Sequence, residues 1–262
     1  MGVIEVEREG GVARVWLNRP DVHNAFNAEV IAGLDETLTS LGSDTSLRAI
    51  VLGGRGRSFS AGADLNWMIA AADLSQEDNA RDAAKLAGML RRLSELPQAT
   101  IARVHGTALG GGLGLLSACD LALGVERAKF GFSEARLGLI PAVISPHCVA
   151  RIGPAKARAL FVTGRRIDAQ AALACGLLDE VLPDDAALDA AVDQALADVL
   201  ACAPGAVAAC KTLVARVAQG GSAAEVDAFT AAQIAARRAS EEGREGIAAF
   251  LGKRPPSWGA AD

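Results

Sequence analysis

The segment Ala108-Leu109-Gly110-Gly111-Gly112-Leu113-Gly114-Leu115 is the most informative stretch of the chain. It lies between two apolar runs, residues 100–106 and 118–123, a pattern that predicts a strand, a glycine turn and the start of a helix. Glycines leave bare backbone against which a ligand can lie, and a helix start offers unpaired N–H groups. Since no Lys-Ser, Lys-Thr or G-x-G-x-x-G accompanies the glycines, a nucleotide loop is disfavoured. Two interpretations remain: a tight structural turn, or backbone donors for a carbonyl oxygen that becomes negative.

Composition restricts the class of protein. The chain has 262 residues, 51% of them hydrophobic and 22% charged, which fits one large domain or one domain with an appendage. A net charge of -5 gives no electrostatic case for nucleic acid or an anionic membrane as a partner. Residues 1–7 are acidic where a secretory signal is basic, and the apolar stretch 106–125 contains six glycines and Asp120. We therefore expect a cytoplasmic protein without a membrane span.

Cysteine and histidine usage predicts no metal site. Three histidines lie far apart in the sequence, and no two cysteines form a C-x-x-C pair. We expect the five cysteines to be reduced core residues: Cys119, Cys148, Cys175, Cys202 and Cys210.

Hydrophobic patterning predicts an α/β core followed by helices. Alternation on either side of Gly10-Gly11 predicts a hairpin of residues 4–7 and 12–17. Asn27 or Asn24 caps a predicted helix whose apolar face runs from Val30 to Leu41. Further strands are predicted at 48–52, 100–104 and 121–125, a polar, mobile stretch at 64–79 and a helix at 80–96. Later helices are predicted at 155–162, 168–174, 186–202, 205–218, 223–239 and 241–251.

Several further motifs follow one another at a characteristic spacing. They are Leu17-Asn18-Arg19-Pro20 with Asn24-Ala25, Gly56 to Leu65, His105-Gly106 with the glycine turn, Ala118-Cys119-Asp120, Phe130 to Pro141, Thr163-Gly164-Arg165, Gly176-Leu177 and Glu245 to Pro255. Together they resemble the crotonase family, the enoyl-CoA hydratase/isomerase superfamily, over nearly the whole chain. The resemblance implies an α/β crotonase (ClpP-like) spiral of repeated ββα units in residues 1–200. It also implies a C-terminal helical region, residues 201–262, that packs in trimers or in hexamers made of two trimers.

The resemblance also assigns a site. The backbone N–H groups of Ala63 and Gly111 are implied as the two donors of an oxyanion hole, each worth roughly 3–4 kcal/mol of transition-state stabilisation. CoA is part of the implied acyl-CoA substrate, so no separate cofactor is expected. The residues implied along the CoA path are Arg19, His23, Ala25, Arg57, Ser60, Ala61, Gly62, Asp64 and Leu65, with Arg55 as a further candidate. Phe250 and Lys253 are implied to reach the adenine end, usually from a neighbouring subunit.

Glu134 is the candidate acid/base. Phe130, Phe132, Leu137 and Leu139 place it in an apolar setting, where desolvation raises the pKa of a carboxyl group. A raised pKa suits a group that gives and takes a proton near neutrality. A helix-start or surface glutamate is the structural alternative. The family motif places Glu134 at the catalytic carboxylate.

Gly114 departs from the two-glutamate hydratases of the family, which carry a second glutamate at this position. Hydration requires water activated toward Cβ and a proton delivered to Cα, work that two carboxylates share easily. Moving a double bond requires only one carboxylate, so Gly114 by itself favours an isomerase.

A resemblance to one branch of the family favours hydration. The stretches 63–68, 112–115 and 139–147 are similar to a bacterial branch of methylglutaconyl-CoA and isohexenylglutaconyl-CoA hydratases, whose substrates carry an extra carboxylate. Asn66, His147 and Arg136 are candidates for binding that group. Three hypotheses therefore stay open: a hydratase of a short or branched enoyl-CoA of the 3-methylglutaconyl-CoA type; a Δ3,Δ2-enoyl-CoA isomerase using Glu134 alone; and a non-catalytic acyl-CoA-binding subunit.

Overall fold

The chain begins with the predicted β-hairpin. In the computed structural model, which describes residues 2–259, β1 (Ile4–Glu9) pairs antiparallel with β2 (Val12–Leu17). Ala13, Val15 and Leu17 alternate with more accessible residues along β2, so one face of the hairpin covers the core.

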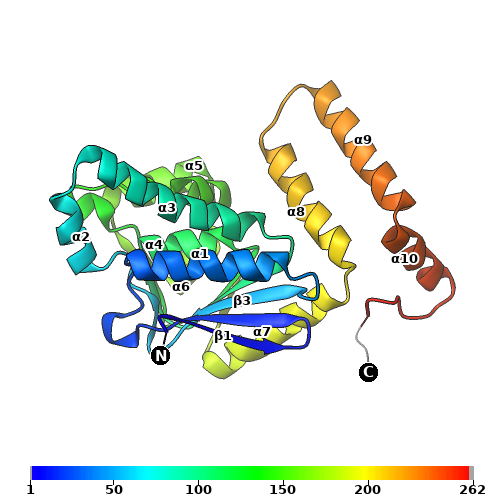
Figure 1. The fold of residues 1–262 in the computed structure, drawn as a ribbon, viewed down its shortest axis with the longest axis horizontal. Coiled ribbons are helices and arrows are strands. Elements are labelled where there is room, and N and C mark those ends of the chain that lie inside the picture. The colour runs from blue at the N-terminus through cyan, green and yellow to red at the C-terminus, as the bar shows by residue number, and fades with distance from the viewer. Residues whose placement is uncertain (1, 260–262) are drawn as a thin grey trace.

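The hairpin, which is blue in Figure 1, forms one edge of a sheet. This sheet has six strands in the order β1-β2-β3-β5-β7-β10. From β2 onward the neighbours are parallel: β3 (Ala49–Gly54), β5 (Ala99–Val104), β7 (Leu121–Val125) and β10 (Glu180–Leu182). Every residue of β3 and β5 is buried. Continuous apolar runs are typical of parallel strands that are covered on both faces.

A second, four-stranded sheet has the order β4-β6-β8-β9. Its strands are β4 (Ser58–Ser60), β6 (Thr107–Leu109), β8 (Lys129–Gly131) and β9 (Arg166–Asp168). These short strands have no recognisable period and were not predicted. The pairs β3/β4, β5/β6 and β7/β8 each place one strand in each sheet before a helix follows, which confirms the repeated ββα architecture.

The first long helices cover the large sheet. α1 (Ala28–Ser43) buries the predicted face, and the Asn27 side chain accepts a hydrogen bond from the Val30 N–H at 3.0 Å. Asn24, the other candidate cap, is buried and instead donates to the carbonyls of Arg55 and Ser58. α3 (Gln76–Glu95) packs against α1 and buries Met89, Leu90 and Leu93.

The stretch 64–79, which is predicted to be polar and mobile, is largely helical. It forms α2 (Leu65–Ala72) and the start of α3. Asp64 caps α2 by accepting from the N–H groups of Asn66 and Trp67, and Ser75 caps α3. Every residue of α2 except Asn66 is apolar, so its pattern has no contrast between a polar and an apolar face on which the prediction of a surface helix depends.

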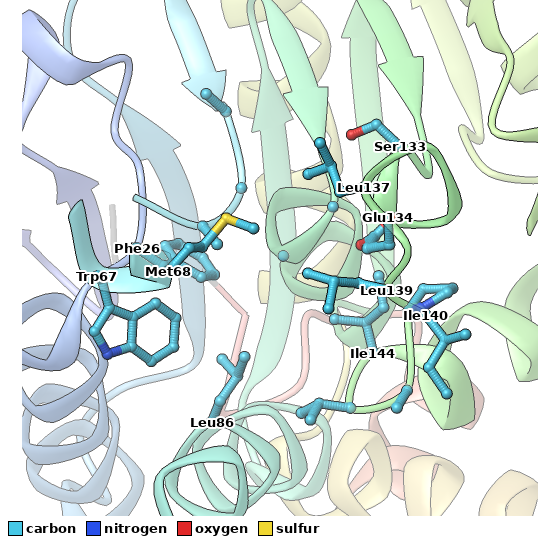
Figure 2. A pocket seen from close by; sticks show the side chains of 18 of the residues that line it. Phe26, Trp67, Met68, Leu86, Ser133, Glu134, Leu137, Leu139, Ile140 and Ile144 are labelled. Carbon is cyan, nitrogen blue, oxygen red and sulfur yellow. The ribbon is translucent and has the colours of Figure 1, made fainter. Parts of the chain in front are cut away.

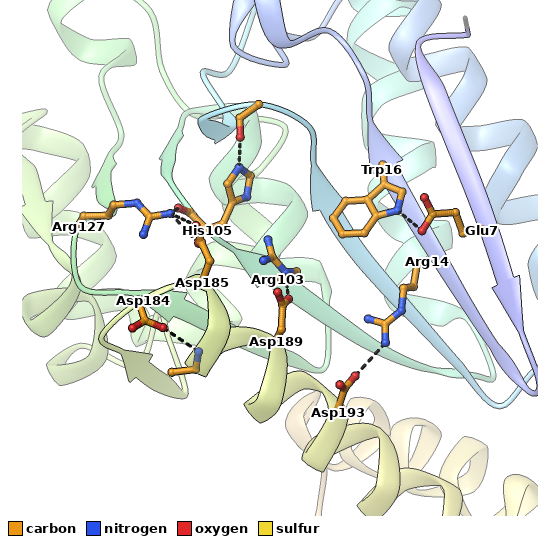
Figure 3. A network of polar contacts seen from close by, with 12 residues as sticks. Glu7, Arg14, Trp16, Arg103, His105, Arg127, Asp184, Asp185, Asp189 and Asp193 are labelled. Carbon is orange, nitrogen blue, oxygen red and sulfur yellow. Dashed lines mark hydrogen bonds and ion pairs between the residues drawn. The ribbon is translucent and has the colours of Figure 1, made fainter.

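The remaining core elements are η1 (Pro20–Val22), α4 (Gly111–Ala118), η2 (Glu134–Leu137), α5 (Ser145–Thr163), α6 (Ala169–Ala174) and α7 (Asp185–Leu200). α5 begins earlier than predicted because its first turns continue across a kink at Gly153, where φ is 74°. Figure 3 shows α7 held to the large sheet by ion pairs, among them Asp189 with Arg103 at 2.5 Å and Asp193 with Arg14 at 2.9 Å.

The last three helices are α8 (Pro204–Ala218), α9 (Ala223–Ala239) and α10 (Glu241–Leu251), and we call them the C-terminal arm. α9 and α10 stand away from the sheets in Figure 1, whereas Lys211 ties α8 to Asp120 at 2.8 Å. The predicted boundary at residue 200 falls where α7 ends. The domain division and the trimer or hexamer stay predictions.

The five cysteines are free, but only partly in the core. Cys119 and Cys148 are buried and Cys175 is half-buried. Cys202 and Cys210 are exposed, contrary to expectation, because Cys202 precedes the C-terminal arm and Cys210 lies within it. Within residues 2–259, no cluster of three or more His, Cys, Asp or Glu side chains is placed to hold a metal ion. Over that same range no single helix is long and apolar enough to cross a membrane. Only α7 and α8 taken together have the length and apolar composition of a membrane span, and the two helices are bent by 101° relative to each other.

Candidate active site

A cavity of about 380 Å³ lies among α2, the start of α4 and the segment from η2 to α5 (Figure 2). Backbone at residues 61–63 and 110–111 lines part of it, and most of the remaining lining is apolar. The lining residues are Phe26, Ala61, Gly62, Ala63, Leu65, Trp67, Met68, Leu86, Gly110, Gly111, Ser133, Glu134, Leu137, Leu139, Ile140, Pro141, Ala142, Val143 and Ile144.

The glycine turn brings three distant segments into contact. Gly110 has a φ of 46°, a conformation that favours glycine, and its N–H donates to the Gly131 carbonyl at 3.1 Å. A Cβ at Gly110 would lie 3.0 Å from Oε1 of Glu134, and one at Gly62 would lie 2.9 Å from the Leu109 carbonyl oxygen. The loop of Gly62, the glycine turn and Glu134 therefore meet at one place.

Ala63 and Gly111, the predicted oxyanion donors, both line this cavity. Phe26 donates to the Gly62 carbonyl at 2.7 Å and accepts from the Asp64 N–H at 2.8 Å, which holds Ala63 in a short β-bridge. Within the described part of the chain, no acceptor receives the N–H of Ala63 or of Gly111. Both N–H groups are therefore available to an oxygen atom of a ligand.

Among the described residues that line the cavity, only Glu134 has an ionisable carboxyl group. Figure 2 shows it on one wall of the cavity, near Leu137 and Leu139 and across from Met68. Its Oε2 is buried and has no hydrogen-bond partner among the described residues. Burial raises the pKa of Glu134, because the ionised form loses its hydration.

The apolar setting of Glu134 differs in detail from the one expected. Phe130 and Phe132 are fully buried in the core, while Leu137 and Leu139 are 61% and 49% exposed. The carboxyl group therefore loses its hydration because it is buried in the cavity wall, and not because all four of these side chains enclose it.

Arg19 and Asp64, both predicted along the CoA path, form an ion pair at 3.0 Å. Arg19 also donates to the Ala25 carbonyl at 2.7 Å, and Asp64 caps α2. Both side chains are thus engaged in holding the loop before α2, and their charges offset each other. A contact of either with CoA stays a prediction.

The other residues predicted along the CoA path lie on two adjoining segments. His23 Nδ1 lies 3.0 Å from the Ser58 hydroxyl, and its Nε2 lies 3.4 Å from a nitrogen of Arg57, which is exposed. Ser60 is fully buried; its hydroxyl donates to the Asn24 carbonyl at 2.9 Å. Ala25 is buried and Ala61 half-buried. Arg55, the weaker candidate, pairs with Glu5 and Glu7.

Phe250 and Lys253 lie at the end of the C-terminal arm, and the cavity lining includes neither. Phe250 is 83% exposed, and α10 lies on the opposite side of the molecule from α2 in Figure 1. Their predicted contact with CoA would therefore require a second copy of the chain. Leu65 is 72% exposed yet lines the cavity.

Sequence reasoning missed several lining residues. Ser133 precedes Glu134, and Phe26 follows a quoted motif, but neither residue type signals a pocket by itself. Leu86 comes from α3 and gave no signal beyond helix periodicity. The candidates for binding an extra carboxylate, Asn66, Arg136 and His147, are absent from the lining, and Arg136 donates instead to the Gly164 carbonyl at 2.8 Å.

Comparison with known proteins places this architecture in a family. The enoyl-CoA hydratase/isomerase family matches residues 7–261. A 2,3-dehydroadipyl-CoA hydratase of Escherichia coli is 34% identical over 263 residues, covering 98% of this chain and 99% of the relative. The crystal structure of an enoyl-CoA hydratase from Shewanella pealeana is 39% identical, with a TM-score of 0.94 over 98% of this chain and 96% of that one. The structure of Pseudomonas aeruginosa AtuE is 35% identical, with a TM-score of 0.94 over 98% of this chain and 100% of that one. The chain is therefore an enzyme of the enoyl-CoA hydratase/isomerase family.

Proposed function

We propose that this enzyme adds water across the double bond of a short or branched enoyl-CoA, with Glu134 as its single acid/base. The proposal depends on one observation: Glu134 and the loops that contain Ala63 and Gly111 line the same cavity. The hydratase names of the relatives from E. coli and S. pealeana support the reaction class.

The proposed chemistry needs no group beyond these residues and the substrate. The Glu134 carboxylate takes a proton from water while the water oxygen bonds to Cβ of the enoyl thioester. The electron pair of the double bond moves toward the thioester, whose oxygen becomes an enolate held by the N–H groups of Ala63 and Gly111. Glu134 then returns the proton to Cα, so one water is consumed and the carboxylate is regenerated. No cofactor is required.

The absence of a second carboxylate supports a second candidate. Helix α4 carries Gly114 where a two-glutamate site has its partner, and within the described cavity lining Glu134 is the only carboxyl group. One carboxylate is sufficient to move a proton from Cγ to Cα, which is a Δ3,Δ2-enoyl-CoA isomerisation. A non-catalytic acyl-CoA-binding subunit does not fit an enzyme of this family, since binding alone requires neither a buried carboxylate nor unpaired N–H donors.

The 3-methylglutaconyl-CoA type of substrate remains part of the proposal. The E. coli relative is named for an acyl group derived from a dicarboxylic acid, which supports an extra carboxylate. The described lining, however, contains no Lys, Arg or His side chain. We therefore expect any second carboxylate to reach solvent at the open mouth of the cavity rather than an ion-pair partner inside it.

The loss or gain of absorbance of the conjugated thioester tests these alternatives. The enzyme is mixed in turn with crotonyl-CoA, 3-methylglutaconyl-CoA and a 3-enoyl-CoA. Loss of conjugation with a 2-enoyl substrate supports the hydratase. If only 3-methylglutaconyl-CoA loses its conjugation, the result supports a substrate of the 3-methylglutaconyl-CoA type. Gain of conjugation from the 3-enoyl substrate alone would replace the hydratase with the isomerase, and binding of all three esters without turnover would overturn both assignments.

Glu134→Gln is the matching variant, and Glu126→Gln, at an exposed position after β7, is its control. We expect Glu134→Gln to abolish turnover and to leave the affinity for the CoA ester within about tenfold, because the amide is isosteric with the acid. Turnover that survives in Glu134→Gln would overturn the acid/base assignment.

A further inference from the structure

The space beside Gly114 is filled by a side chain from another segment. Gly114 is buried in α4, and a Cβ there would overlap Cγ2 of Ile144 and lie 2.9 Å from its Cβ. Ile144 is 3% exposed and directly precedes α5, and it also lines the cavity that contains Glu134 (Figure 2). The apolar residue thus contacts both α4 and the candidate active site.

These contacts are of the kind that does not relax easily. The Ile144 atoms involved are the branched Cβ and a methyl group attached to it, and branching at Cβ restricts χ1. Cδ1 of Leu90 also lies 3.3 Å from the same hypothetical Cβ, but this is the end of a flexible side chain. Ile144 is therefore the principal obstacle to any side chain at position 114.

We propose that Ile144 is a specificity-determining residue of this site, because its side chain fills with hydrocarbon the space that a carboxylate at position 114 would enter. The pair Gly114–Ile144, and not Gly114 alone, keeps the cavity to one carboxylate. The catalytic part of this inference rests on the proposed function. The steric coupling of the two positions does not.

The chemistry of the cavity follows from this pair. With Ile144 in place, the wall beside α4 is apolar, and Glu134 must carry every proton transfer alone. Removing the Ile144 side chain and adding a glutamate at 114 would supply a second proton carrier to the same cavity.

Four proteins test the coupling: the wild type, Gly114→Glu, Ile144→Gly and the double variant. We expect Gly114→Glu alone to lower the urea midpoint of unfolding and the kcat/KM for hydration of crotonyl-CoA, because its Cβ overlaps Ile144. The double variant is expected to exceed Gly114→Glu by about tenfold in kcat/KM, the size of coupling found between residues in direct contact. The pH profile of its kcat/KM gains a second acidic group that Gly114→Glu in the wild-type background lacks.

Ile144→Ala combined with Gly114→Glu is the matched control. Alanine keeps the Cβ of residue 144, which lies 2.9 Å from a Cβ at position 114. The double variant with alanine should therefore recover less of the urea midpoint and of kcat/KM than the double variant with glycine. If Gly114→Glu equals the wild type, or if the effects of the two substitutions on unfolding are additive, the steric proposal is wrong. If the unfolding data show the coupling but neither the wild type nor the double variant hydrates any enoyl-CoA, the proposed function fails while the coupling stands.

Discussion

Replacement of Asp64 separates a structural role from a role in CoA binding. Its side chain accepts hydrogen bonds from the N–H groups of Asn66 at 2.9 Å and Trp67 at 3.4 Å, and it pairs with Arg19 at 3.0 Å. The next residue toward the N-terminus is Ala63, a proposed oxyanion donor. Any loosening of Asp64 is therefore transmitted directly to the cavity.

The structure sets the size of the effect. Loss of a helix N-cap costs about 1 kcal/mol of unfolding free energy. The side chains of Arg19 and Asp64 are 20% and 10% exposed, so breaking the pair falls between the surface and buried cases, at about 2 kcal/mol. We expect Asp64→Ala to lose both contributions, about 3 kcal/mol, and Asp64→Asn, which can still cap α2, to lose only the ion pair.

Urea unfolding at pH 7 measures these differences, with Asp73→Ala, exposed at the other end of α2, as the control near zero. Burial alone would raise the pKa of Asp64, but hydrogen bonds from Arg19, Asn66 and Trp67 outweigh it and lower that pKa below 3.8. The stabilisation by ionised Asp64 is thus present above pH 3.8 and is lost as the pH falls through the lower, folded-state pKa. The difference in unfolding free energy between the wild type and Asp64→Asn should therefore become smaller at acidic pH.

Two outcomes would contradict this account. Equal stabilities of Asp64→Ala and Asp64→Asn would show that the cap contributes nothing. An unchanged unfolding free energy with a raised KM for the CoA thioester would show that Asp64 binds substrate, as the family resemblance implies, rather than holding the loop.

Three further predictions concern the site and the arm. Because burial raises the pKa of Glu134, the acidic limb of a pH profile of kcat/KM should be centred above 4.5; a limb at or below that value would contradict its role as the base. Gly110→Ala places a methyl group 3.0 Å from Oε1 of Glu134 at a φ of 46°, so steady-state kinetics should show about a 100-fold loss of kcat, and an unchanged kcat would refute the close contact. Lys211→Met removes contacts to Asp120 at 2.8 Å and the Gln98 carbonyl at 2.9 Å. It should lower the unfolding free energy by about 1–3 kcal/mol in urea titrations, whereas no change would show that the arm is held elsewhere.

Elements with strong local signals agree with the prediction from sequence. The spacing of Val30 through Leu41 predicted α1 and its buried face, and of the two candidate caps the structure selects Asn27. The apolar runs predicted β3, β5 and β7, because strands covered on both faces carry mostly hydrophobic residues; Thr100 and Arg103 in β5 are the polar exceptions. By contrast, the three residues of β4 or β6 carry no period at all, and only pairing within the second sheet makes them strands.

In the candidate site, too, some features were recognised from the sequence and others were shown only by the structure. Glu134 and the glycine turn were recognised from local motifs, and the structure brings them together at Gly110. Only part of the environment of Glu134 could be read from its neighbours in sequence, since the leucines after it line the same cavity but the phenylalanines before it belong to the core. The roles of Arg19 and Asp64 as partners of each other depend on the path of the loop between them.

By itself, the sequence determined the family, the order of the ββα units and the residue types needed for oxyanion chemistry, because each depends on short segments whose chemistry is local. Only the tertiary structure decided which side chains meet. The sequence shows that glycine occupies position 114, where the two-glutamate hydratases carry a carboxylate. Only the packing of Ile144, directly before α5, shows why a larger side chain would not fit there. Such exclusion is a property of close-packed atoms from distant segments, and no pattern along the chain contains it.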